Sequence, residues 1–272
     1  MVAEAQPSKW RVRTMGQGVS RRQLVHGLAA GVPLAAVLSS PALAQAVAAT
    51  LTTVTGTTPS GRTVQASLAV PAKLPAPAVV LIHEFWGLND QIRAVAAEAA
   101  REGMLALAID LYGGAVASER EAAKKLMEAV DPAVATETVA FWIQWLKARK
   151  DATGKVATLG WCFGGGWSLN ASIAEPVDAT VIYYGRVDRP AEQLARLKGP
   201  VLGHFASRDA WINAEMVGGF EKAMATAGKP LTVYWYDADH AFANPTGARY
   251  DADDAQLAWQ RTLTFLKATL GA

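Results

Sequence analysis

The chain contains one cysteine, and its neighbours suit that residue to act as a nucleophile. Cys162 lies in a Gly160-x-Cys162-x-Gly164 pattern, between an apolar run at 156–159 that predicts a buried strand and residues 168–173, which predict a helix. The flanking glycines allow a sharp, strained turn that lifts one side chain above the end of a strand. The positive end of the following helix would stabilise a thiolate and a developing oxyanion. The alternative is a small buried residue without chemistry.

A thiol nucleophile needs a base, and the base needs a carboxylate that orients it. His240 lies in a polar loop after the predicted strand at 231–236 and is the candidate base. Asp209 follows the predicted strand at 201–205 and is the candidate orienting carboxylate. Other residues compete for these two roles. The histidines His83 and His204 are alternatives for the base, and Asp188, Asp237 and Asp239 are alternatives for the carboxylate, unless they have structural roles.

Strands and helices alternate along most of the chain after residue 45, which predicts one α/β domain with a doubly wound, mostly parallel sheet and right-handed crossovers. Functional groups in such sheets gather at the carboxyl ends of the strands. Glu84, Cys162, Asp209 and His240 each follow a predicted strand, so we expect them to converge. The predicted strands are 46–54, 63–70, 78–82, 104–109, 156–159, 179–184, 201–205 and 231–236.

These residue types predict a defined reaction. A thiolate at Cys162 attacks a carbonyl carbon, and His240, held in one tautomer by Asp209, transfers the proton. The backbone N–H groups of Phe163, which follows the nucleophile, and of Phe85, in the loop after the 78–82 strand, are expected to bind the oxyanion.

The basic residues are concentrated at the start of the chain. The net charge is +2, but residues 45–272 carry 21 basic and 23 acidic side chains, which excludes the basic footprint of a nucleic-acid-binding protein. Arg21 and Arg22 form a twin-arginine pattern, followed by a weakly apolar run at 27–38 and an A-x-A cleavage site at 42–44. We therefore expect a signal peptide at 1–44 and a hydrolase domain at 45–272, periplasmic or secreted and free of the membrane after cleavage. The alternative is a disordered basic tail followed by a surface helix.

The chain from about Thr52 to its end resembles the dienelactone hydrolase family of the α/β-hydrolases. The resemblance is carried by the segments 83–89 (HEFWGLN), 110–112 (DLY), 160–165 (GWCFGG) and 239–242 (DHAF). It implies an α/β-hydrolase fold, a triad of Cys162, His240 and Asp209, and a Glu84 that contacts the resting thiol and helps to generate the thiolate. The implied substrates are cyclic enol-lactones bearing a carboxylate, opened to a keto acid through a thioester without metal or organic cofactor.

The resemblance also implies substrate contacts. Arg120 falls at the position of a family arginine that holds the substrate carboxylate. Four residues later, this chain has Lys124 where the family has an aromatic hydroxyl; the alternative for Lys124 is a side chain on a solvated charged face. This chain has Asn244 at the position of a second family arginine, and Arg249 is the candidate to take over the role of that arginine. The expected partner is a small-molecule lactone or ester, bound by a monomer or weak homodimer. The expected substrate-binding residues are Arg120, Lys124, Trp86 and Tyr112.

A second hypothesis comes from another functional class. The chain could be a redox-sensing or ligand-binding protein on a hydrolase scaffold, with Cys162 as its reactive thiol. The combination of the elbow pattern with Asp209 and His240 favours the hydrolase, because a binding scaffold has no need of all three.

Overall fold

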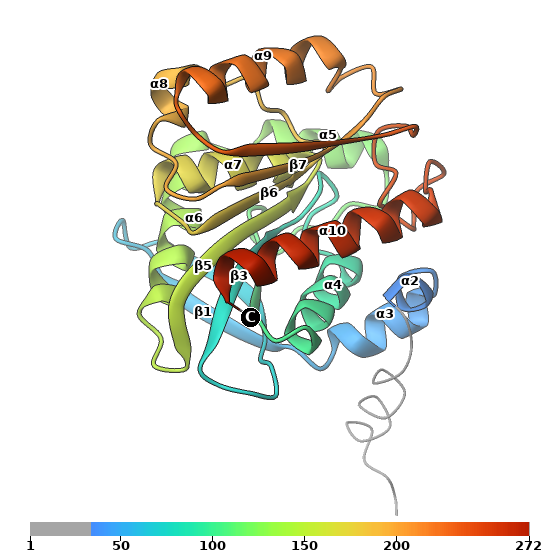
Figure 1. The fold of residues 1–272 in the computed structure, drawn as a ribbon. Helices are drawn as coiled ribbons and strands as arrows, with labels where there is room; N and C mark the ends of the chain where they lie inside the picture. Colours follow the sequence, from blue (N-terminus) through green and yellow to red (C-terminus); the bar gives the residue numbers. More distant parts are fainter. Residues whose placement is uncertain (1–33, 272) are drawn as a thin grey trace, which may run out of the picture.

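The computed structural model describes residues 34–271, so the predicted twin-arginine motif at Arg21 and Arg22 lies outside the described residues. The described chain forms one eight-stranded sheet in the order β1-β2-β4-β3-β5-β6-β7-β8 (Figure 1). The strand β2 is antiparallel to β1 and β4, and the remaining neighbours are parallel. This confirms the predicted α/β fold. The strands are β1 (Thr52–Thr57), β2 (Thr63–Ala69), β3 (Ala76–Ile82), β4 (Leu105–Ile109), β5 (Ala152–Trp161), β6 (Ala179–Tyr183), β7 (Val201–Ala206) and β8 (Leu231–Tyr236).

The central strands are apolar throughout because helices cover both faces of the sheet. In β3, Val79 and Leu81 belong to the core formed with α4 and α10, whereas Val80 and Ile82 belong to the core formed with α6. All four side chains are fully buried. Burial of each such side chain contributes roughly 1.5–3 kcal/mol to the folded state.

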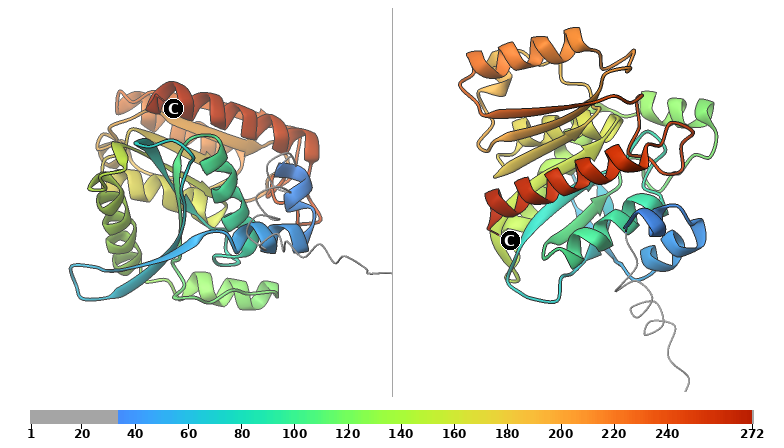
Figure 2. Two further views of the ribbon diagram at one scale, coloured as in Figure 1. Left: turned by 90° about the horizontal axis from the view of Figure 1, so that it is seen from below. Right: turned by 45° about the vertical axis from the view of Figure 1, so that its right-hand side comes forward.

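Two sets of helices cover the sheet. Helices α4 and α10 lie on the same face, and α6, α7 and α9 pack on the other, as the views in Figures 1 and 2 show. The short helices α2 and α3 lie against α4. The helices are α2 (Leu34–Leu38), α3 (Pro41–Ala48), α4 (Asp90–Arg101), α5 (Arg120–Glu128), α6 (Pro132–Lys147), α7 (Phe163–Ala174), α8 (Ala191–Leu194), α9 (Ala214–Thr226) and α10 (Ala252–Leu270).

The strand expected at 46–54 is partly wrong, because helix α3 continues to Ala48 and β1 begins at Thr52. Ser40 caps α3 by accepting a hydrogen bond from the Leu43 N–H, and Val47 is buried in the core shared with α4. An alanine-rich segment favours a helix once a neighbouring helix can bury one of its faces. The predicted cleavage site at 42–44 lies within α3, and cleavage there stays a prediction.

The starts of α5 and α6 are capped differently. Helix α5 begins at Arg120, and its N-cap residue Glu119 makes no side-chain capping bond. Helix α6 begins at Pro132, where Asp131 accepts hydrogen bonds from the N–H groups of Ala133 and Val134.

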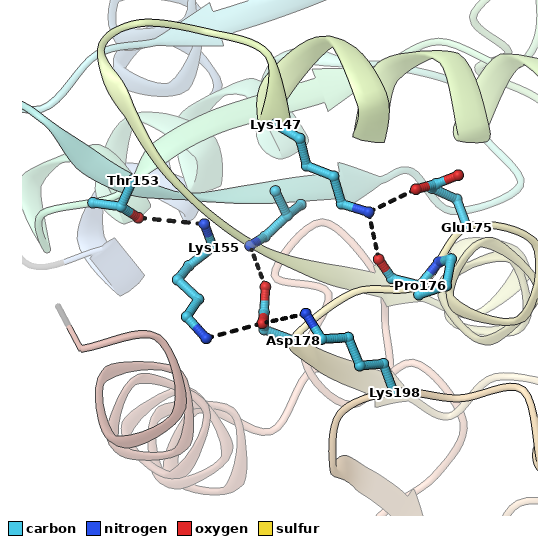
Figure 3. Close-up of polar contacts among 8 residues, drawn as sticks. Lys147, Thr153, Lys155, Glu175, Pro176, Asp178 and Lys198 are labelled. Carbon is cyan, nitrogen blue, oxygen red and sulfur yellow. Dashed lines mark hydrogen bonds and ion pairs between the residues drawn. The ribbon is translucent and has the colours of Figure 1, made fainter.

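A cluster of ion pairs holds the amino-terminal end of the parallel strands together (Figure 3). The buried Asp178 accepts hydrogen bonds from the Val156 N–H and from the ammonium groups of Lys155 and Lys198, at 3.0–3.1 Å. The cluster lies where β5 enters the sheet, and Cys162 follows the other end of the same strand. Its role is therefore to connect strands. Within 34–271, no helix is long and apolar enough to cross a membrane.

Candidate active site

Cys162 lies in the turn between β5 and α7, with φ 54° and ψ −117°. This is a conformation that residues with a side chain rarely adopt, and such strain is concentrated at functional sites. The turn needs glycine on both sides, because a Cβ on Gly160 would lie 1.9 Å from the Gly164 carbonyl oxygen. A Cβ on Gly164 would lie 2.1 Å from the Ile82 carbonyl oxygen on the neighbouring strand β3. The sequence pattern therefore reflects a close approach of the helix to the sheet.

A continuous hydrogen-bonded chain joins the three expected triad residues. The His240 Nε2 lies 3.2 Å from the Cys162 Sγ, and the His240 Nδ1 lies 2.6 Å from the Asp209 Oδ2. The other Asp209 oxygen accepts hydrogen bonds from the N–H groups of Trp211 and Ile212, at 2.8 and 3.0 Å. These backbone bonds fix the carboxylate, which in turn fixes the imidazole against the sulfur.

The pairing changes the proton affinity of both partners. Burial alone would lower the pKa of His240, but its hydrogen bonds to Asp209 and Cys162 outweigh burial and raise the pKa to about 10. Burial likewise opposes the charge of Asp209, but the His240 ring and two backbone N–H groups hold the pKa of that carboxyl below its usual range. The electrostatics therefore favour a protonated His240 ring beside an ionised Asp209.

Glu84 is brought to the same edge of the sheet, but it does not make the expected contact with the thiol. Among residues 34–271, the hydrogen-bond partner of the Cys162 Sγ is the His240 Nε2. The Glu84 carboxylate instead accepts a hydrogen bond from the Asn244 Nδ2 and a longer one, 3.4 Å, from the Tyr184 hydroxyl. Burial raises the pKa of Glu84 to about 7, against the opposing effects of the charge on His240 and the Asn244 hydrogen bond.

The raised pKa of Glu84 predicts a pH-dependent stability. Because the folded protein binds this proton more tightly than the unfolded chain, Glu84 favours folding at low pH, and that contribution is lost as the pH rises through about 7. We expect Glu84→Gln to raise the free energy of unfolding at pH 8 by about 1–3 kcal/mol and to change it little at pH 5. Urea titrations at both pH values measure this, with the exposed Glu128→Gln as control. Equal effects at both pH values would contradict it.

The competing residues have structural partners. His204 is buried between the Tyr236 hydroxyl at 2.8 Å and the Thr262 hydroxyl at 3.0 Å, and burial lowers its pKa to about 3. His83 is buried and bridges the Glu84 carbonyl oxygen, at 2.6 Å, and the Leu111 N–H, at 3.2 Å. Both histidines therefore support the scaffold.

The competing aspartates form ion pairs on the surface. Asp188 pairs with Arg186 and Arg189, and Asp237 and Asp239 pair with Arg208.

The two expected oxyanion donors, Phe163 and Phe85, lie at the start of α7 and in the loop after β3. Phe163 is the first residue of α7, so its N–H has no acceptor within the helix. Phe85 follows Glu84 in the loop between β3 and α4, and the centres of the Phe85 and Trp86 rings lie 4.4 Å apart.

Tyr112 brings a hydroxyl to the same region. Its ring lies 4.6 Å from the ring of His83, and its hydroxyl is buried without a hydrogen-bond partner among the described residues. Burial raises the pKa of Tyr112, and negative charge at Cys162 raises it further. The hydroxyl is therefore available to a group bound near the sulfur.

Two cations share one indole at the site. The guanidinium of Arg120 lies 5.9 Å from the centre of the Trp211 ring, and that of Arg249 lies 5.3 Å from it. Trp211 in turn contacts the His240 ring edge-on, with centroids 5.3 Å apart. Sequence reasoning missed Trp211, and its position two residues after Asp209 was the available signal. Lys124 pairs with Glu128 at 3.8 Å on the exposed face of α5, which agrees with the solvated alternative.

The sheet order, the strained turn after β5 and the groups at the carboxyl ends of β3, β5, β7 and β8 define an α/β-hydrolase fold. Residues 64–270 match the profile of the dienelactone hydrolase family, and the chain belongs to that family.

Individual relatives cover most of the chain. The carboxymethylenebutenolidase of Pseudomonas putida is 30% identical over 217 residues, covering 76% of this chain and 92% of the relative. Carboxymethylenebutenolidase 1 of Cupriavidus pinatubonensis is 26% identical over 220 residues, covering 77% of this chain and 94% of the relative. Among solved structures, a dienelactone hydrolase-like promiscuous phosphotriesterase from metagenomic libraries has a TM-score of 0.73 at 23% identity, covering 80% of this chain and 98% of that one. The chain is thus a hydrolase of this family.

Proposed function

We propose that this hydrolase opens a lactone or ester by nucleophilic attack of Cys162 and passes through a thioester. The observation that carries the proposal is the unbroken chain from Asp209 through His240 to the Cys162 sulfur, at 2.6 and 3.2 Å. Within this hydrogen-bonded series the pKa of His240 is raised to about 10, as expected of an imidazolium that faces a thiolate.

The reaction proceeds in two steps. In the first, the thiolate adds to the carbonyl carbon, the carbon–oxygen bond to the leaving group breaks, and the His240 Nε2 gives its proton to the departing oxygen. For a lactone, the leaving oxygen stays attached to the acyl chain, so the ring opens. In the second, His240 takes a proton from water, the resulting hydroxide attacks the thioester, and the carbon–sulfur bond breaks to give the acid and the thiolate.

Backbone groups stabilise the charge that develops on the carbonyl oxygen in both steps. We assign this role to the N–H groups of Phe163 and Phe85, since the first opens α7 and the second lies in the loop after β3. The positive end of α7 adds to the stabilisation. Loss of one such donor typically costs about 3 kcal/mol of transition-state stabilisation.

Replacement of Cys162 by alanine is expected to abolish turnover of p-nitrophenyl acetate and of simple enol-lactones. The reason is that no other group can form the thioester, which acid quenching of the wild type followed by mass spectrometry should detect on Cys162. Equal turnover by both proteins would contradict the proposal. Absence of turnover by the wild type, together with reversible sulfenic acid at Cys162, would favour the redox-sensing hypothesis.

We further propose that the substrate carries a carboxylate, bound by Arg120 and Arg249 at the Trp211 ring. The proposal is supported by two guanidiniums beside the residue that contacts His240, because an anion there would face both cations. Trp86 and Tyr112 are the other proposed substrate contacts. In this role they would contribute an aromatic surface and a hydroxyl.

The double variant Arg120→Ala/Arg249→Ala is expected to raise KM for a carboxylate-bearing lactone by about ten-fold or more, since a hydrogen bond to a charged group contributes about 1.5–3 kcal/mol. KM for the uncharged p-nitrophenyl acetate should change much less. Steady-state kinetics on both substrates measure the difference, and Lys124→Ala on the same helix as Arg120 is the control. A similar rise for both substrates would show that the arginines do not recognise the carboxylate.

For the leader, we propose export by the twin-arginine pathway with cleavage after Ala44, which is supported by the motif at Arg21 and Arg22 and the A-x-A site. Ala44 is buried in the core shared with α4, so cleavage requires α3 to detach from that helix first. N-terminal sequencing of the protein recovered from the periplasm should begin at Gln45. Retention of Met1 would contradict the proposal.

A further inference from the structure

We propose that Asn244 is a positioning residue that holds the Glu84 carboxyl group away from Cys162, so that the Cys162–His240 pair is formed before a substrate binds. The inference rests on the proposed function, in which Cys162 is the nucleophile. The new element is that Glu84 is already held away from the sulfur in the resting enzyme, so substrate binding is not needed to release it.

The orientation of the Asn244 side chain is fixed by its neighbours. Asn244 is 3% exposed, and its Oδ1 accepts hydrogen bonds from the Thr246 N–H at 2.9 Å and the Thr246 hydroxyl at 2.7 Å. Because an amide oxygen accepts and an amide nitrogen donates, these two bonds direct the Nδ2 towards Glu84, where it donates to the Oε2. A flipped amide would lose the bond from the Thr246 N–H and would place its oxygen against the Glu84 carboxylate.

The second oxygen of Glu84 is held from another element. The Tyr184 hydroxyl, which follows β6, donates to the Oε1 at 3.4 Å, and the Tyr184 ring contacts the His240 ring edge-on at 5.2 Å. Glu84 therefore has a partner on each oxygen, from Asn244 and from Tyr184. The sulfur of Cys162 is left to the imidazole.

Asn244 and the base are carried by the same turn. The Phe242 N–H donates to the Asp239 carbonyl oxygen at 3.2 Å, and the Asn244 N–H donates to the Ala241 carbonyl oxygen at 3.0 Å. The turn that brings His240 to the sulfur thus also brings the amide to Glu84. The two placements are coupled by backbone hydrogen bonds.

Loss of the amide should release the carboxyl group. In Asn244→Ala, Glu84 keeps its buried position at the end of β3 but loses its strong donor, and the His240 ring, whose charge already acts on Glu84, can replace it. Pairing with the imidazolium keeps the Glu84 carboxyl group ionised and takes the ring away from the thiolate. The reactivity of Cys162 is therefore lowered.

Alkylation of the substrate-free protein by iodoacetamide, measured from pH 5 to 9, tests this directly. We expect Asn244→Ala to react roughly ten-fold more slowly than the wild type at pH 7. The double variant Asn244→Ala/Glu84→Gln should recover most of the wild-type rate, because a neutral amide cannot form an ion pair with the imidazolium. Asn170→Ala, which removes an asparagine bound to Arg189, is the matched control.

Two results would overturn the inference. One is alkylation of Asn244→Ala at the wild-type rate, and the other is a slower rate that Glu84→Gln does not restore, since general damage to the fold would not be rescued. Alkylation is independent of turnover, so the proposed function can fail separately. A protein that shows the expected profiles but hydrolyses no lactone or ester would retain the positioning role and lose the hydrolytic one.

Discussion

Replacing Asp209 with asparagine is expected to lower kcat for ester hydrolysis by about a thousand-fold or more, with little loss of stability. The asparagine Oδ1 can still accept from the N–H groups of Trp211 and Ile212, so the loop keeps its shape. The negative charge that raises the pKa of His240 is lost, and an amide can hold the ring in the wrong tautomer.

Single-turnover and steady-state rates over a range of pH check this prediction. The matched control is Asp188→Asn, which removes an exposed carboxylate paired with Arg186 and should leave kcat unchanged. The activity of Asp209→Asn should not recover with rising pH, because the defect is in the orientation and the charge of the base. A variant with wild-type kcat would show that His240 works without its carboxylate.

Gly164→Ala is expected to destabilise the fold by about 3 kcal/mol or more. The new Cβ would lie 2.1 Å from the Ile82 carbonyl oxygen and 2.5 Å from that of His83, and these are backbone atoms of a central strand and its end, which cannot turn aside. Helix α7 would have to move away from the sheet, which would also displace Cys162. Activity should therefore fall together with stability.

Thermal unfolding followed by circular dichroism should show a Tm lower by about 6–12 °C for Gly164→Ala. Gly218→Ala is the control, since this glycine lies in the interior of α9 with nothing within 4 Å of the added Cβ. That control should leave the Tm unchanged or raise it slightly. Equal Tm values for the two variants would mean that α7 can shift without cost.

Local sequence pattern predicted the parts of the site that depend on strand order. The apolar runs of β3 and β5 and the glycines around Cys162 identified the sheet and the turn, because full burial and close approach both restrict the residue types. The order of Cys162, Asp209 and His240 along the chain was enough to place them together, since parallel strands end at one edge.

The remaining features depend on contacts between distant segments. The carboxyl group of Glu84 was expected at the thiol, but its place is decided by Asn244, 160 positions later in the sequence. The position of Trp211, two residues after Asp209, was a weak signal on its own, and its place at the site became visible only in the contacts of its ring with Arg120 and Arg249. The helix at Pro41–Ala48 forms where a strand was expected to begin, because α4 offers it an apolar face.

One connection, residues 237–251 between β8 and α10, carries the base His240, the amide of Asn244 and the guanidinium of Arg249. In the proposed reaction, proton transfer, control of the resting sulfur and binding of the substrate carboxylate would all depend on this one connection, whereas Cys162 follows a core strand. We expect exchange of the connection between relatives to change substrate preference, provided that its buried residue Phe242 is kept. Residues 237–251 are therefore the segment in which we expect relatives with different substrates to differ most.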